Sequence, residues 1–518
     1  MRRQTTWWPA ALLSLFALVP AAAQPQAREE GMKKEEKEEH RFEPPKPEEK
    51  IVTTQHRVTI DGREIRYTAT AGTLLLKEED GKPKASMFFI AYTRDGVQDL
   101  GKRPITFTYN GGPGSSSVWL HMGAFGPRRV VMDDEGLSAA PPYRLVDNNE
   151  SILDVTDLVF IDPVTTGYSR AVPGEDPKQF YGLREDAEAV AEFIRLYTTR
   201  FGRWASPKFL SGESYGTTRS AALSKHLQER HGMYLNGVIL ISSILNFQTA
   251  RFSVGNDLPY PLFLPTYTAT AWYHKRLPQD LQAAGLQKAV DEARRFALGE
   301  YTVALAQGNN LPEPQWNDIA AKVARYTGLS PEFVKRTNLR PPIFQFTKEL
   351  LRDQRQTVGR LDSRFKGIDR DASGEGFEFD PSYAAIQGPY TAVLYNYVSQ
   401  DLGFKSELTY EILTGRVRPW NWGEEGEQGF VNVAEDLRSA MSANPALKVF
   451  VGNGYYDLAT PFFATEYTFD HLVFEPGYED RVTMKYYEAG HMMYIRRADH
   501  VQLKRDVAEF IRSAGGMS

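Results

Sequence analysis

The chain has 518 residues, with 61 lysines and arginines against 66 aspartates and glutamates, giving a formal net charge of −5. This near-even balance argues against a nucleic-acid-binding protein, which normally carries a basic surplus, and 42% hydrophobic residues argue against a disordered chain. The lack of cysteine excludes disulfides, iron–sulfur clusters, cysteine zinc sites and thiol nucleophiles. The length fits about three domains, or one large α/β domain with an insertion.

The first 52 residues have the composition of an export signal followed by a linker. Residues 1–23 carry positive charge near their start, at Arg2 and Arg3. An apolar run from Trp7 to Pro20 and three alanines follow, and this order is typical of a cleaved signal peptide. The apolar run is shorter than the roughly 20 residues that span a bilayer, so we expect no stable membrane insertion after cleavage. Residues 24–52 are rich in Glu, Lys and Pro and predict a charged, disordered tether. The sequence thus predicts an exported protein, periplasmic or secreted.

Hydrophobic patterning from residue 53 onward predicts a sheet with two kinds of strand. Short alternating runs at residues 56–60, 65–68 and 86–92, separated by turns, indicate antiparallel strands. Apolar strand candidates then alternate with helix candidates at residues 183–197 and 217–230. The strand candidates lie at residues 105–109, 158–161, 208–210, 237–242, 448–451 and 482–486. Such alternation indicates a mainly parallel sheet that is covered by helices on both faces.

The alternation stops between residues 246 and 440, where helical segments, prolines and aromatic residues follow one another. The simplest interpretation is a mostly helical cap at 246–440, inserted between two parts of one core domain at 53–245 and 441–518. Six aromatic residues of this insertion are candidates for lining a substrate pocket, although most aromatic residues serve packing. They are Tyr260, Phe263, Tyr267, Trp272, Trp420 and Trp422.

A candidate nucleophile lies at Ser214, in the G-x-S-x-G sequence from Gly212 to Gly216. Small glycines on both sides allow a sharp turn from strand to helix that lifts the serine oxygen above the sheet. The run before it is typical of a strand and the run after it of a helix, as this turn requires. The alternative is a buried serine in an ordinary turn.

A serine hydroxyl needs a base and an orienting acid, and two residues near the end of the chain fit these roles. His491 follows the strand candidate at 482–486, and Asp457 follows the one at 448–451. The order Ser, Asp, His is typical of α/β-hydrolases. Asp162 is a rival acid because it also ends a strand, but it precedes the serine in the chain.

A glycine-rich loop from Asn110 to Ser116 directly follows the strand candidate at 105–109. Its backbone N–H groups are candidates for an oxyanion hole, together with the N–H of Tyr215 after the nucleophile. The alternatives are a purely structural turn and a nucleotide-phosphate loop. The second lacks support because the Lys-Ser/Thr ending of such loops is missing.

These motifs together resemble the serine carboxypeptidases of the S10 family. The matching pieces are residues 110–116, 160–163, 167–169, 212–216, 454–461 and 490–492. The resemblance implies an α/β-hydrolase fold and a catalytic triad of Ser214, Asp457 and His491. It implies an oxyanion hole from the amides of Gly112 and Tyr215, and no metal or organic cofactor. It further implies that Asn110, the Gly111 amide and Glu213 bind the C-terminal carboxylate of the substrate.

The assignment of Glu213 also agrees with elementary electrostatics. Burial and a neighbouring substrate carboxylate both raise the pKa of a carboxyl group, and only a protonated Glu213 would donate a hydrogen bond to that carboxylate. We therefore expect activity to be highest at acidic pH. One departure concerns the wall of this site, where Thr108 stands in the position at which family members commonly have tryptophan.

The sequence therefore predicts an exported serine carboxypeptidase that acts on the C-termini of peptides or proteins. An esterase, amidase or acyltransferase with the same triad is the first alternative. A noncatalytic binding protein on a hydrolase scaffold is the second.

Overall fold

A computed structural model describes residues 47–472 and 476–516 of the chain. The expected signal peptide and most of the expected tether lie outside this range. The tether expected at 24–52 extends two residues too far, because the first strand begins at Ile51, which pairs with Gly72 of the next strand. None of the helices in the described ranges combines the length and the apolar composition of a membrane-spanning segment.

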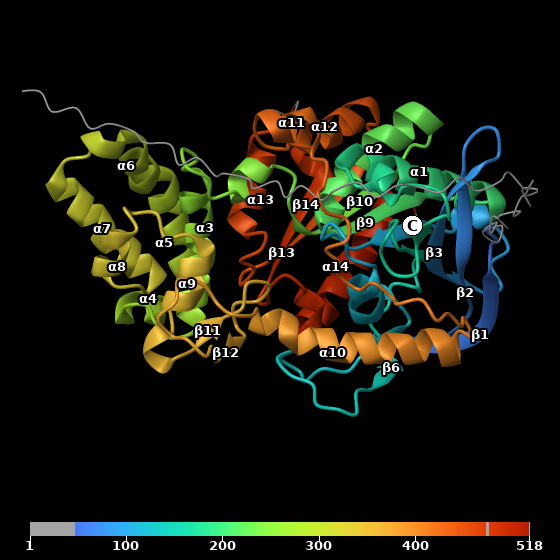
Figure 1. The fold of residues 1–518 in the computed structure, drawn as a ribbon, viewed down its shortest axis with the longest axis horizontal. Coiled ribbons are helices and arrows are strands. Elements are labelled where there is room, and N and C mark those ends of the chain that lie inside the picture. Colours follow the sequence, from blue (N-terminus) through green and yellow to red (C-terminus); the bar gives the residue numbers. More distant parts are fainter. Residues whose placement is uncertain (1–46, 473–475, 517–518) are drawn as a thin grey trace, which may run out of the picture. The chain divides into compact units, whose positions relative to one another are not determined.

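A ten-stranded sheet forms the centre of the fold (Figure 1). The strands of this sheet, in chain order, are β1 (Ile51–Ile60), β2 (Arg63–Lys77), β3 (Pro83–Arg94), β4 (Ile105–Tyr109), β7 (Asp157–Ile161), β8 (Arg170–Ala171), β9 (Lys208–Ser214), β10 (Gly237–Ser243), β13 (Lys448–Gly454) and β14 (Val482–Tyr487). Two further pairs lie outside it, β5 (Arg128–Val130) with β6 (Leu145–Asp147) and β11 (Thr357–Val358) with β12 (Lys366–Gly367).

The spatial order of the main strands is β1-β2-β3-β7-β4-β9-β10-β13-β14, with β8 paired to β3. The neighbouring pairs β1–β2, β2–β3 and β3–β7 are antiparallel, whereas every neighbouring pair from β7 to β14 is parallel. The central strands β4, β7 and β10 are buried throughout, as expected for apolar runs in a parallel sheet that is covered on both faces. The α/β-hydrolase fold expected from the sequence is therefore present.

Helices cover both faces of the sheet. On one face, α1 (Leu183–Arg200), α2 (Tyr215–His231) and α12 (Ala434–Ala443) pack into one hydrophobic cluster with the strands. On the other face, η2 (Leu120–Phe125), α10 (Pro381–Asn396) and α14 (Arg497–Ala514) complete a second cluster. In α1 the apolar stripe predicted by the sequence is buried, at Ala187, Val190, Ala191 and Ile194.

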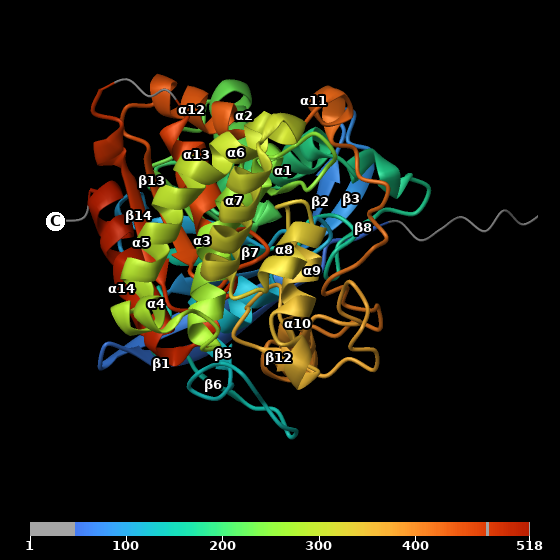
Figure 2. The same cartoon turned by 90° about the vertical axis from the view of Figure 1, so that its left-hand side faces the viewer.

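The insertion after β10 is mostly helical, but its parts belong to three different cores. Most of its helices form a third hydrophobic cluster with the loop after β13. These helices, which group beside the sheet in Figure 1 and in front of it in Figure 2, are α3 (Pro259–Tyr273), α4 (Gln279–Ala284), α5 (Leu286–Phe296), α6 (Thr302–Gln307), α7 (Glu313–Thr327), α8 (Pro331–Arg336) and α9 (Ile343–Glu349). In contrast, α10 and α12 pack on opposite faces of the central sheet, and the short helix α11 (Gly423–Gln428) lies between them in the chain. Helix α13 (Phe462–Asp470) follows β13 and lies outside the insertion. The expected range 246–440 is thus helical without being one separately packed cap.

Candidate active site

The candidate nucleophile Ser214 is the last residue of β9 and directly precedes α2. Its backbone has φ 60° and ψ −130°, a left-handed conformation that is costly for a residue with a side chain. The turn is tight enough that a Cβ on Gly212 would lie 2.1 Å from the Gly216 carbonyl oxygen. Glycine at position 212 is therefore required by the turn, and the strand–turn–helix context expected for a nucleophile elbow is present.

The side chains of Asp457 and His491 meet at the same edge of the sheet. His491 Nδ1 lies 2.7 Å from Asp457 Oδ2, and both residues are buried. The Asp457 carboxylate also accepts the backbone N–H groups of Ala459 and Thr460 and the hydroxyl of Thr460. Burial opposes the charged imidazolium, but the charge and hydrogen bond of Asp457 together hold the pKa of His491 above its ordinary value. The carboxylate thus fixes the ring orientation and leaves Nε2 as the free nitrogen.

Ser214 and His491 line one cavity of about 570 Å³. The Ser214 hydroxyl makes no hydrogen bond with any residue that the structure describes. The cavity also exposes Gly112 and Tyr215, the two residues whose amides were expected to form an oxyanion hole. Gly112 has φ 103°, and a Cβ on Gly111 would lie 2.4 Å from the Tyr215 nitrogen, so this loop approaches the elbow backbone too closely for larger residues. The glycines therefore bring two sets of backbone amides beside the nucleophile.

Glu213 lies beside Ser214, and hydrogen-bond donors reach both of its carboxyl oxygens. Asn110 Nδ2 donates to Oε1 at 2.8 Å, and the Tyr494 hydroxyl donates to Oε2 at 2.6 Å. Burial raises the pKa of Glu213 to about 7, against the opposing effects of His491 and these hydrogen bonds. A pKa raised in this way favours the protonated form of Glu213 in acidic solution. Asn110 is itself held by the Leu120 N–H, which donates to its Oδ1 at 3.0 Å.

Sequence reasoning did not identify Tyr494 as a site residue. The only indication in the sequence was that Tyr494 lies three residues after His491. Trp119 was missed as well; it lines the cavity, and its Nε1 donates to the Ser115 hydroxyl at 3.1 Å. Thr108, the position that departs from the family pattern, is buried inside β4 and does not line this cavity.

Asp162, the rival acid, has a different environment. Its Oδ1 accepts the backbone N–H of Ser117 at 2.9 Å, at the end of the glycine-rich loop. Burial raises the pKa of Asp162 to about 7. Gly167, with φ 48°, packs so closely that a Cβ there would overlap the Asp162 carboxyl group. Asp162 thus anchors the loop from behind, whereas His491 pairs with Asp457.

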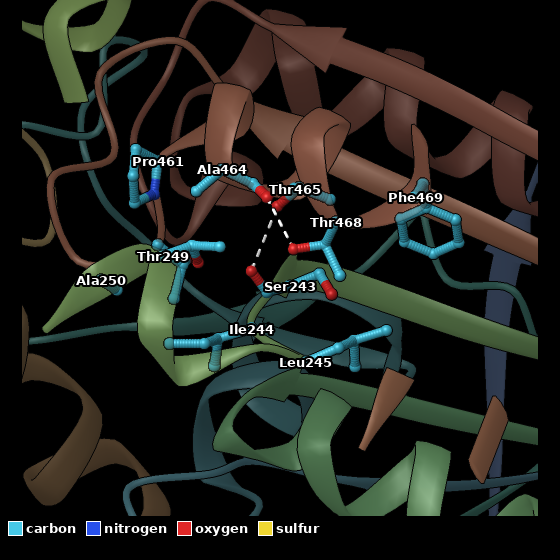
Figure 3. Close-up of a pocket in the computed structure, with 11 residues that line it drawn as sticks. Ser243, Ile244, Leu245, Thr249, Ala250, Pro461, Ala464, Thr465, Thr468 and Phe469 are labelled. Carbon is cyan, nitrogen blue, oxygen red and sulfur yellow. Dashed lines mark hydrogen bonds between the residues drawn. The ribbon is translucent and has the colours of Figure 1, made fainter. Parts of the chain in front are cut away.

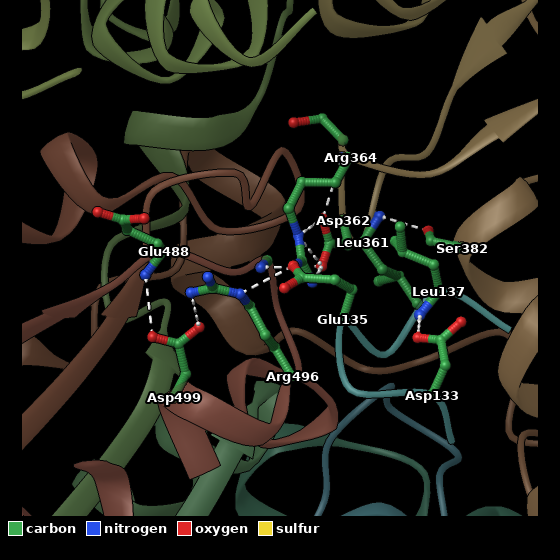
Figure 4. A network of polar contacts seen from close by, with 12 residues as sticks. Asp133, Glu135, Leu137, Leu361, Asp362, Arg364, Ser382, Glu488, Arg496 and Asp499 are labelled. Carbon is green, nitrogen blue, oxygen red and sulfur yellow. Dashed lines mark hydrogen bonds and ion pairs between the residues drawn. The ribbon is translucent and has the colours of Figure 1, made fainter. Parts of the chain in front are cut away.

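A segment of the insertion, Arg360–Arg364, connects the loops that carry Asp457 and His491. Its backbone accepts the N–H of Leu458 and of His491 through the carbonyls of Arg360 and Leu361, at 3.1 and 2.7 Å. The Asp362 carboxylate accepts the Gly490 N–H at 3.0 Å and binds the Arg364 guanidinium, and both side chains are buried (Figure 4).

The same network fixes the start of α14. Arg496 bridges Glu135 and Asp499, and Asp499 accepts the Glu488 N–H at 3.2 Å (Figure 4). The histidine loop is therefore held from both of its sides. The sequence gives no sign of this arrangement, because the residues that meet are far apart along the chain.

Of the six aromatic candidates, Trp422 alone is among the described residues that line this cavity. Tyr260, Phe263, Tyr267 and Trp272 belong to the helical cluster beside the sheet, and Trp420 packs edge-on against Tyr215. A small recess of about 10 Å³ adjoins the cavity and shares some of its lining. Figure 3 shows this recess, where the Thr465 hydroxyl donates to the Ser243 carbonyl and so ties α13 to the end of β10.

Comparisons with known proteins found similar sequences and a similar fold. A family model described as serine carboxypeptidase matches residues 67–505. Among curated relatives, serine carboxypeptidase-like 29 of Arabidopsis thaliana is 25% identical over 35% of this chain and 37% of its own length. The pheromone-processing carboxypeptidase KEX1 of Colletotrichum graminicola is 31% identical over 24% of this chain and 18% of its own length.

Among solved structures, the prohormone-processing carboxypeptidase KEX1 of Saccharomyces cerevisiae superposes with a TM-score of 0.54 at 16% identity. The superposition covers 86% of this chain and 92% of the yeast chain, which extends the likeness in fold well beyond the matched sequence. The curated relatives, by contrast, are matched over well under half of their length.

Proposed function

We propose that this chain, which belongs to the serine carboxypeptidase family, hydrolyses the C-terminal peptide bond of peptides or proteins. Ser214 is the nucleophile, His491 the general base and Asp457 the acid that orients it. The observation that carries the proposal is the position of Glu213, a buried carboxyl group with a pKa of about 7, directly beside the nucleophile. An esterase has no need of a protonatable carboxyl group at this place.

In the first half of the reaction, His491 Nε2 takes the proton of Ser214 as the hydroxyl oxygen attacks the last peptide carbonyl. The amides of Gly112 and Tyr215 stabilise the oxyanion, and losing one such donor typically costs about 3 kcal/mol of transition-state stabilisation. His491 then gives its proton to the departing amino acid. In the second half, water activated by His491 hydrolyses the acyl-enzyme and restores Ser214.

The substrate carboxylate binds to Asn110, the Gly111 amide and Glu213. Although both Glu213 oxygens accept hydrogen bonds, the protonated form still offers its own O–H to the substrate. The ionised form repels the substrate carboxylate instead. Because the competent form exists below a pKa of about 7, binding weakens as the pH rises through that value.

His491 sets the limit on the acidic side. The base must be neutral to accept the serine proton, and its pKa lies above the ordinary value. In the competent state Glu213 carries a proton and His491 is neutral. A second state, in which the same proton lies on His491 and Glu213 is ionised, has the same total number of protons. A bound substrate carboxylate favours the state in which the proton lies on Glu213. We therefore expect a bell-shaped dependence of kcat/KM on pH that declines toward alkaline values.

We further propose that the protein is exported and acts in the periplasm or outside the cell. The support is the sequence of residues 1–23, with its basic start, short apolar run and alanine cleavage site.

The test compares N-blocked dipeptides that carry either a free or an amidated C-terminus, using the purified protein and its Ser214→Ala variant. Release of the last amino acid from the free acid, with little release from the amide and none by the variant, supports the carboxypeptidase. Turnover of simple esters alone indicates an esterase. Silence toward every acyl substrate, together with failure of a fluorophosphonate probe to label Ser214, indicates a noncatalytic scaffold.

A further inference from the structure

Three arginines are among the described residues that line the candidate active-site cavity: Arg251, Arg360 and Arg418. They come from separate parts of the insertion. Arg251 follows the short helix η4 (Phe247–Ala250), Arg360 follows β11, and Arg418 lies in the loop before α11. The fold therefore brings three cations to one cavity from positions that are distant in the sequence.

None of these three guanidinium groups forms an ion pair or a hydrogen bond with a residue that the structure describes. Other arginines of the insertion are paired, as Arg340 is with Asp257. The Asp380 carboxylate accepts the backbone N–H groups of Arg360 and Leu361 and not the Arg360 guanidinium. The charges of the three cavity arginines are thus available to a ligand.

Aromatic rings hold one of these cations near the nucleophile. The Arg251 guanidinium lies 5.4 Å from the centre of the Phe247 ring and 5.8 Å from that of Trp422. The Trp422 ring in turn packs edge-on against Tyr215, the residue after Ser214. Burial and the nearby charge of Arg360 lower the pKa of Arg251, as expected for two cations that face each other without an anion between them.

Glu213 is the only carboxylate among the described residues that line the cavity. Since its pKa is about 7, it contributes little negative charge in acidic solution. The cavity is therefore strongly positive under the conditions in which the carboxylate site is competent. A positive, partly enclosed surface attracts anionic ligands and disfavours cationic ones.

We propose that this cavity selects peptides with an acidic side chain on one of the last two residues, bound by Arg251, Arg360 and Arg418. This inference rests on the proposed carboxypeptidase function. The C-terminal carboxylate has its own site at Asn110, Gly111 and Glu213, so the arginines remain for a second negative charge. A volume of about 570 Å³ leaves room for side chains on both sides of the scissile bond.

The test measures kcat/KM near pH 6 for four N-blocked dipeptides, Glu-Ala, Gln-Ala, Ala-Glu and Ala-Gln. At this pH a substrate glutamate, with an ordinary pKa of about 4.3, is ionised. We expect the glutamate peptide of at least one pair to be hydrolysed about tenfold faster than its glutamine counterpart, a preference that shrinks with added salt. Equal rates within both pairs would overturn the proposal.

Variants of the three cavity arginines test which of them causes the preference for an acidic side chain. Arg251→Gln, Arg360→Gln and Arg418→Gln are each made alone, and we expect at least one to lower the glutamate-to-glutamine ratio about threefold or more. The matched control is Arg505→Gln, an exposed arginine on α14 outside the cavity, which should keep the ratio unchanged. Variants that slow glutamate and glutamine peptides equally would place the guanidiniums on the terminal carboxylate and refute the proposal.

A binding measurement separates this proposal from the proposed function. Calorimetry with the Ser214→Ala variant and the same four peptides reports charge preference without turnover. Tighter binding of a glutamate peptide supports acidic selectivity even if no peptide is hydrolysed by the unaltered protein, a result that would refute the carboxypeptidase alone. Equal affinities within both pairs would refute the selectivity, whatever the catalytic outcome.

Discussion

The ends of β9 and β7 carry the same chemical feature in two different settings. Glu213 and Asp162 are each about 2% exposed, and burial raises the pKa of each to about 7. Glu213 faces the cavity beside Ser214, whereas Asp162 holds the Ser117 N–H behind the glycine-rich loop. Burial is the largest cause of the raised pKa of both groups, and access to the cavity distinguishes a candidate substrate ligand from a structural anchor.

The largest expected effect on kcat comes from replacing the serine near one strand end and not the serine near the other. Ser214→Ala removes the proposed nucleophile, and we expect kcat to fall by at least about 10⁴-fold with little change in thermal unfolding. Ser169→Ala is the matched change near Asp162, where the hydroxyl donates to the Asp162 carbonyl at 2.6 Å. The Ser169 hydroxyl also accepts the buried Phe88 N–H at 2.8 Å, so this control should cost about 1–3 kcal/mol of stability and leave kcat within about tenfold. Comparable losses of kcat in both variants would contradict the assignment.

The second difference concerns stability. Asp162→Ala leaves the buried Ser117 N–H without its acceptor, so we expect the free energy of unfolding to fall by about 1–3 kcal/mol. Asp162→Asn retains an acceptor oxygen and should recover most of that loss. Chemical denaturation of both variants measures the effect, and an Asp162→Ala protein of unchanged stability would show that the anchor is unimportant.

The third difference is in the dependence of activity on pH. Glu213 is competent when protonated, so on the alkaline side of its maximum kcat/KM should decrease by about tenfold per pH unit as Glu213 ionises above its pKa of about 7. Glu213→Gln keeps an N–H donor that does not titrate, and its profile should lose this alkaline decline. Asp162→Asn is the control and should retain the decline, since Asp162 does not line the cavity. A flat profile for the unaltered protein would count against the proposed role of Glu213.

The smallest effect is expected from Tyr494→Phe. The Tyr494 hydroxyl stabilises the charged form of Glu213, so its removal should raise the pKa of Glu213 further. The alkaline decline then moves to higher pH, with kcat/KM at neutral pH changed by less than about fivefold. Paired pH profiles of the two proteins check the direction, and a shift toward lower pH would contradict the hydrogen-bond argument.

Local sequence was sufficient for most of the sheet. The strand candidate at 105–109 coincides with β4, because a short apolar run bounded by turn residues has few other places in a soluble fold. The lengths of the outer strands were underestimated. Strand β2 continues to Lys77, nine residues beyond the expected end. Pairing with β1 and β3 supports this extension, and such partners are invisible to a local pattern.

The insertion was less predictable than the sheet. Its helical character follows from composition and spacing, but α10 and α12 pack on the central sheet rather than with the helices between them. An apolar helix face does not specify which surface it will cover. For the same reason, five of the six aromatic candidates do not line the cavity, whereas Trp119, which no local pattern indicated, does.

By itself, the sequence determined the strand–turn–helix geometry around Ser214, the glycine-rich loop and the chain order of Ser214, Asp457 and His491, because each depends on neighbouring residues. Only the tertiary structure decided that His491 pairs with Asp457, that Tyr494 meets Glu213 and that three arginines face one cavity. These contacts join residues separated by tens to hundreds of positions. Their formation depends on how strands and loops pack, which no short stretch of sequence encodes.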